Sequence, residues 1–72
     1  MTDTKELELL IKDSGLKKSY IAKTLGLSRQ GLANKIQNKS PFTSTEISCL
    51  CKVLDITSLK DKERIFFATN VI

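Results

Sequence analysis

Residues 17–40 read KKSYIAKTLGLSRQGLANKIQNKS, two segments with apolar residues at helical spacing on either side of Gly26. Its first part predicts a short helix over residues 18–25, in which Ile21 and Ala22 lie on an apolar face. Gly26 follows, and glycine readily takes the left-handed conformation in which helices commonly end. We therefore expect a helix that stops sharply at a tight turn.

The second part of this stretch predicts another helix directly after the turn, over about residues 28–37. Ser28 can cap it by accepting from a free backbone N–H group, and Leu32 and Ile36 recur at helical spacing. A small residue at Ala22 lets the two helices cross closely. Two short helices joined by a glycine turn are typical of the helix-turn-helix arrangement of DNA-binding proteins.

Three further helices are indicated outside this stretch. Asp3 can cap an N-terminal helix that stops at Gly15. Thr43 and Glu46 form the threonine-x-x-glutamate capping box of a fourth helix. The last helix starts after Ser58. Its inward face is expected to hold Leu59, the aliphatic stem of Lys62, Ile65 and Phe66.

The 72 residues contain no alternating strand pattern of usable length, no internal repeat and no Pro- or Gly-rich linker. A chain of this length has room for one small core. We therefore predict an all-α single domain of five helices over residues 1–72. Residues 68–72 are expected to form a flexible tail or a dimer contact.

The net charge of +4 is concentrated in the middle of the chain. From Ser14 to Thr45 there are six bases and no acid. A solvated helical face normally mixes both signs, so this run favours a polyanionic partner. Nucleic acid is the first candidate, and a membrane surface fits poorly because the bases are spread over two short helices.

The helix after the turn carries side chains that suit base reading. Gln30, Asn34 and Gln37 project away from its apolar face, and Arg29 lies at its N-terminal end. Amide side chains can pair bidentately with adenine, and Arg with guanine, while Gly31 would let the helix settle deeper in a groove. We predict that Arg29, Gln30, Gly31 and Asn34 read bases; the alternative is a solvated face that happens to hold amides.

Polar and basic residues around this helix are expected to hold DNA phosphates and so fix the register of the protein. Ser28 contributes through its hydroxyl and the free N–H groups of the helix start. The full expected set is Lys17, Lys18, Ser28, Lys35, Asn38 and Lys39.

Catalytic and metal chemistry have little support in the sequence. There is no His, no Gly-rich phosphate loop and no paired carboxylate beside a pocket-forming segment, so we expect neither an enzyme nor a cofactor. Cys49 and Cys51 are separated by one residue, which places them about 200° apart on a helix, where they cannot easily bridge. We expect no metal, a buried Cys51 thiol and a partly exposed Cys49 thiol.

The cell compartment is also indicated by the sequence. Reduced thiols, an acidic N-terminus without an apolar core, and the lack of any run approaching about 18 apolar residues predict a cytoplasmic protein without a signal peptide or membrane anchor.

The string KKSYIAKTLGLSRQGLANKIQNKS resembles the Cro/CI-type helix-turn-helix regulators of temperate phages and their bacterial relatives, and the five-helix order extends this resemblance over nearly the whole chain. The resemblance implies a λ-repressor-like DNA-binding domain with the helix-turn-helix at helices 2 and 3. It also implies that Lys18 contacts phosphate and that Arg29, Gln30, Gly31 and Asn34 contact bases. The resemblance further implies a role in the lysis–lysogeny switch of a phage inside its bacterial host.

Two functions are open at this point. The first is a transcriptional regulator, such as a Cro-like repressor, that binds an operator in double-stranded DNA as a homodimer, because one short helix reads few base pairs. The side chains available for a dimer contact are Ile65, Phe66, Phe67, Val71 and Ile72, with plain core as the alternative for the first two. The second is a modulator of repression that docks its basic surface on a partner CI-type repressor and changes its operator binding.

Overall fold

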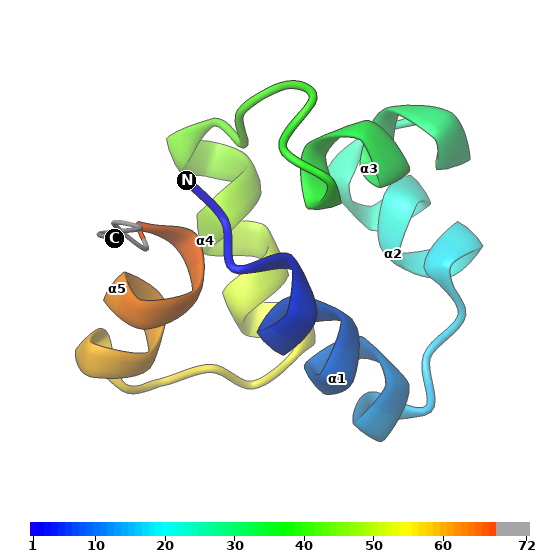
Figure 1. Cartoon of the computed structure of the whole chain (residues 1–72). Helices are drawn as coiled ribbons and strands as arrows, with labels where there is room; N and C mark the ends of the chain where they lie inside the picture. The colour runs from blue at the N-terminus through cyan, green and yellow to red at the C-terminus, as the bar shows by residue number, and fades with distance from the viewer. Residues whose placement is uncertain (68–72) are drawn as a thin grey trace.

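The computed structural model describes residues 1–67, and over these residues it contains five helices and no strand (Figure 1). The helices are α1 (Thr4–Ser14), α2 (Lys18–Leu25), α3 (Arg29–Ile36), α4 (Ser44–Val53) and α5 (Leu59–Phe66). The expectation of an all-α chain with five helices is confirmed. The expectation for residues 68–72, including Val71 and Ile72, lies outside the described residues.

Side-chain caps explain where the helices begin. Asp3 Oδ1 accepts from the Glu6 N–H, and Ser28 Oγ accepts from the Gly31 N–H at 2.9 Å. The Thr43 side chain and the Glu46 carboxylate cap α4 reciprocally, as the capping-box pattern predicts. Each cap satisfies backbone donors that the first helical turn leaves free, so the sequence identified these helix starts correctly.

The helices surround one hydrophobic core, and each of them contributes two buried residues. These are Leu7, Ile11, Ile21, Ala22, Leu32, Ile36, Leu50, Cys51, Ile65 and Phe66, joined by Ile56 from the α4–α5 connection. Phe42 packs edge-on against Phe66, with ring centroids 5.9 Å apart. Because all five helices share this core, the apolar face of each helix is covered by residues of the other helices.

The expectation that Leu59 packs inward is wrong, because its side chain is 71% exposed. Leu59 points in about the same helical direction as Phe66, but it lies about 10 Å earlier along the axis. At this position, the first residue of α5, the side chain lies largely in solvent. Ile65 and Phe66 belong to the core, which was the alternative to a dimer contact for these two residues. Phe67 is 59% exposed.

The two sides of the molecule are built from different helices (Figure 1). α2 and α3 lie together on one side and pack against each other, while α4 and α5 lie on the other. α1 contacts both α3 and α5, and α2 also packs on α4. α3 therefore packs with one face on α1 and α2 and presents its opposite face to solvent. None of the described helices is long and apolar enough to cross a membrane.

Candidate nucleic-acid interface

A short, sharply defined turn sets α3 against α2. Gly26 has φ 76°, and its N–H donates to the Lys23 carbonyl. The next N–H, of Leu27, donates to the Ala22 carbonyl at 2.8 Å, and Ser28 then caps α3. Ala22 is buried to 2% exposure, as expected for a small residue between helices that pack closely. The turn therefore has the left-handed glycine and the cap that the sequence predicted.

α3 has one buried face and one exposed face. Leu32 and Ile36 are each only 1% exposed, whereas Arg29 and Gln30 are exposed and Asn34 is half-buried. Gln30 Nε2 donates to Asn34 Oδ1 at 2.9 Å, so the two amides form a pair along the helix. The pair leaves the side-chain oxygen of Gln30, Oε1, as an acceptor and the side-chain amide nitrogen of Asn34, Nδ2, as a donor. One acceptor beside one donor is the combination that an adenine edge complements in the major groove.

Gly31 has a role inside the protein that the sequence did not reveal. A Cβ at this position would lie 3.1 Å from Ser28 Oγ and 3.9 Å from Leu27 Cβ. Glycine therefore leaves room for the hydroxyl that caps α3. The space needed by the capping hydroxyl explains a glycine at this position without any bound DNA. The expected closeness of Gly31 to DNA stays a prediction.

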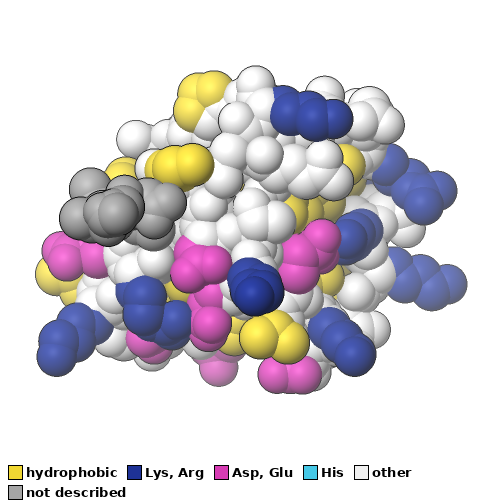
Figure 2. Space-filling model, viewed as in Figure 1, with side chains coloured by type: hydrophobic (Ala, Val, Ile, Leu, Met, Phe, Trp, Pro, Cys, Tyr) yellow, Lys and Arg dark blue, Asp and Glu magenta, His cyan; other side chains and the backbone are white. Residues whose placement is uncertain are grey.

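Five of the six basic residues of the acid-free run lie at exposed positions around α2 and α3, and Lys35 is the exception. Figure 2 shows dark-blue side chains along the edge formed by these helices, whereas blue and magenta mix over α1 and α5. Within residues 1–67, Lys17, Arg29 and Lys39 are exposed and form no ion pair. Lys18 differs, since its Nζ lies 2.8 Å from Glu8 Oε1 on α1. An exposed ion pair of this kind is weak and leaves the ammonium open to competition from a phosphate.

Two residues of the expected phosphate set are already engaged inside the protein. Lys35 Nζ lies 2.6 Å from Glu46 Oε1, and the two side chains are only 15% and 14% exposed. The Asn38 side chain bonds both the N–H and the carbonyl of Thr2, each at 2.8 Å. We therefore remove Lys35 and Asn38 from the phosphate set. Sequence reasoning missed their partners because these lie on other elements. The one available signal was that Lys35 directly precedes Ile36, an expected core residue, which indicates that Lys35 lies close to the core.

The Lys35 contact gives Glu46 a pH-dependent role. The hydrogen bond from Lys35 and the Thr43 backbone N–H lower the pKa of Glu46 from its ordinary value of 4.5. A carboxyl whose pKa is lowered by folding stabilises the protein above its unfolded pKa, and this contribution is lost as the pH falls through the lowered value.

We therefore expect the free energy of unfolding of the wild type to fall more steeply between about pH 6 and about pH 3 than that of Glu46→Gln. Urea unfolding at a series of pH values measures both slopes. All other carboxyl groups are common to the two proteins, so the difference reports Glu46. Parallel curves would contradict the pairing.

The thiols have the exposures expected from the sequence. Cys51 is buried to 4% exposure, and burial raises the pKa of its thiol. Cys49 is half-buried, and its Sγ donates to the Thr24 carbonyl at 3.7 Å. Residues 1–67 bring no three His, Cys, Asp or Glu side chains together in a way that could hold a metal ion.

No protein-family model matches the chain, and neither a curated protein nor a solved structure is found to be similar to it. The resemblance to Cro/CI-type regulators therefore rests on the string of residues 17–40 and on the order of the five helices.

Proposed function

We propose that this chain is a sequence-specific DNA-binding transcriptional regulator of the Cro/CI type. In this proposal α2, the turn and α3 form a helix-turn-helix within a λ-repressor-like domain, and α3 enters the major groove. The observation that carries it is the exposed Gln30–Asn34 amide pair on a capped helix directly after the turn. Exposed cations and an acid-free run surround this pair, as a polyanionic partner requires.

The proposed DNA contacts divide into two kinds. Arg29, Gln30 and Asn34 read base edges, with Gly31 facing the groove between them. Lys17, Lys18, Lys39 and the Ser28 end of α3 contact phosphates and fix the register. The two kinds are separable by experiment, because phosphate contacts act on DNA of any sequence and base contacts on selected sequences only.

The size of the domain supports a dimer on DNA. α3 has eight residues and is about 12 Å long, which covers only a few base pairs. The longest dimension of the molecule is 33 Å, close to the separation of about 34–36 Å between half-sites one DNA turn apart. In this proposal, two copies bound to neighbouring half-sites present two α3 helices to one face of an operator. By its resemblance, the regulated step is the lysis–lysogeny switch of a temperate phage in the cytoplasm of its host.

Salt dependence tests the phosphate contacts. Lys39→Met is expected to weaken binding to a mixed-sequence duplex and to reduce the slope of log K against log salt by about one. Lys60→Met is the matched control, because Lys60 is exposed on α5 among acidic neighbours. Equal slopes for wild type and Lys39→Met would show that this cation does not contact phosphate.

A second candidate function, modulation of a partner CI-type repressor, is favoured by one exposed aromatic residue. Tyr20 on α2 is 55% exposed, and Lys17 and Lys23 lie one turn to either side. An exposed Tyr among cations suits a protein interface with an acidic partner, since Tyr is enriched at interface centres.

Tyr20→Ala separates the two functions. If the chain docks on a repressor, we expect binding to the repressor encoded beside it to weaken by more than about tenfold, as for an interface hot spot. The affinity for operator DNA is expected to stay unchanged, because base reading belongs to α3. Calorimetric titration with the purified repressor measures the first quantity, and unchanged repressor binding would remove Tyr20 from any such interface.

A further inference from the structure

The C-terminal half of α3 is fastened to α4 by a largely buried ion pair. Lys35 reaches Glu46 at 2.6 Å, and the same Glu46 oxygen accepts from the Thr43 N–H at 2.9 Å. One carboxylate therefore caps α4 and holds α3 at the same time. The low exposure of both side chains protects this contact from solvent and salt.

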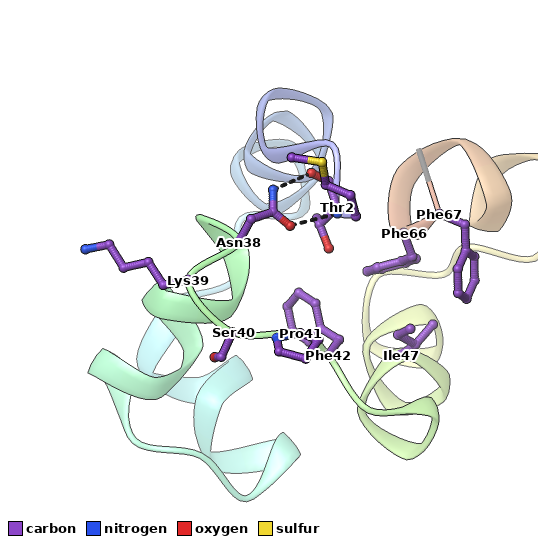
Figure 3. A pocket seen from close by; sticks show the side chains of 10 residues that line it. Thr2, Asn38, Lys39, Ser40, Pro41, Phe42, Ile47, Phe66 and Phe67 are labelled. Atoms are coloured by element: carbon purple, nitrogen blue, oxygen red, sulfur yellow. Dashed lines mark hydrogen bonds between the residues drawn. The ribbon is translucent and has the colours of Figure 1, made fainter. Parts of the chain in front are cut away.

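The end of α3 is fastened a second time by the N-terminal segment (Figure 3). Asn38 has φ 64°, and its side chain closes a two-bond ring with the backbone of Thr2. Thr4 Oγ1 donates to the Ile36 carbonyl at 2.6 Å, which satisfies an acceptor that the helix end leaves free. The Asp3 N–H donates to the Ile65 carbonyl, so this segment is itself anchored on α5.

We infer that Asn38 is a positioning residue, which acts with the Lys35–Glu46 pair to fix the tilt of α3 before any ligand binds. This inference rests on the proposed function for its consequence, because Lys35 and Asn38 would hold the amides of Gln30 and Asn34 in place without contacting DNA themselves. A helix fixed in advance loses less freedom on binding, so its fixation increases affinity for the matching sequence. Asn38 then affects DNA reading without touching DNA.

Asn38→Gly tests the inference cleanly. Glycine adopts the left-handed conformation freely, so the variant keeps the backbone turn and removes the side-chain bonds to Thr2 and the longer one, at 3.4 Å, to the Thr4 hydroxyl. Asp55→Gly is the matched control, because Asp55 is the other described non-glycine residue with positive φ, at 58°, and lies after α4, away from α3. Both substitutions have the same effect on backbone freedom.

The first readout needs no DNA. In Asn38→Gly, amide hydrogen exchange at Gln37, Asn38 and Lys39 is expected to accelerate about tenfold or more, because their N–H groups bond to carbonyls in the last turn of α3. In Asp55→Gly these amides are expected to exchange as in the wild type. Unchanged exchange in Asn38→Gly would overturn the inference.

The second readout is binding. Asn38→Gly is expected to weaken binding to a selected duplex by about threefold to thirtyfold, while binding to a mixed-sequence duplex and its salt slope stay unchanged. An equal loss on both duplexes would overturn the inference, since it would make Asn38 a phosphate contact. Absence of selective binding by the intact protein would refute the proposed function, whereas the exchange comparison decides the positioning role by itself.

Discussion

The double variant Gln30→Ala with Asn34→Ala is expected to lose selective DNA binding and to keep its affinity for duplexes of unrelated sequence. A good amide–adenine pairing contributes about 1–3 kcal/mol of discrimination, so we expect affinity for a selected duplex to fall by about fivefold to 150-fold. The exposed cations are untouched, and the phosphate contacts proposed for them do not depend on DNA sequence. Titration of one selected duplex and one mixed-sequence duplex with both proteins gives the two affinities.

A matched control exists on α4, where Ser44 and Ser48 are also exposed and one turn apart. Ser44→Ala with Ser48→Ala makes an equal number of truncations on a helix outside the proposed interface, and selective binding is expected to survive. Retained selectivity in the Gln30 and Asn34 variant would show that another surface reads the sequence. A parallel loss on both duplexes would instead indicate damage to the fold.

Leu50→Ala is expected to remove most of the stability of the domain at room temperature. Leu50 is completely buried in the core, and truncation of a buried leucine costs about 2–5 kcal/mol. A domain of this size rarely has more than about 3–5 kcal/mol of stability from its core, so this single change removes most of it. Circular dichroism during urea unfolding measures the loss.

Leu59→Ala makes the same truncation on an exposed side chain of α5. We expect it to change the free energy of unfolding by no more than about 0.5 kcal/mol. Comparable destabilisation by the two variants would contradict the core described above, and so would a stable Leu50→Ala protein.

The helix boundaries could be predicted because their signals are local. Asp3, Ser28 and Thr43 each bond a backbone N–H three residues ahead, and Gly15 and Gly26 take the left-handed conformation themselves. Nothing else in the fold has to be known for such contacts to form. The apolar face of α3 followed in the same way from helical periodicity, since Leu32 and Ile36 are one turn apart.

The roles of Lys35, Asn38 and Leu59 depend on elements that are distant in sequence. Glu46 lies 11 residues after Lys35, and Thr2 lies 36 residues before Asn38. The periodicity of one helix does not indicate which other element packs against a given side chain. A lysine or amide in an acid-free segment therefore looked like a phosphate contact, and Leu59 looked like a core residue although its side chain is largely exposed.

The polar residues on the exposed face of α3 could be predicted from the sequence, but the hydrogen bond between them could not. Gln30 and Asn34 are one turn apart and both polar, which indicates a shared face. The hydrogen bond between them depends on rotamers, and it determines which groups stay free for a ligand. It also makes their contributions interdependent, so single substitutions of either residue are not expected to add up to the effect of the double variant.

The central proposal, that α3 reads DNA sequence, is tested most directly by selection of binding sites from a random-sequence duplex pool with the intact protein. We expect the recovered duplexes to share a short half-site, repeated about one DNA turn apart in inverted orientation. Recovery of duplexes with no common motif, from a protein that is folded and binds DNA weakly at low salt, would contradict the proposal.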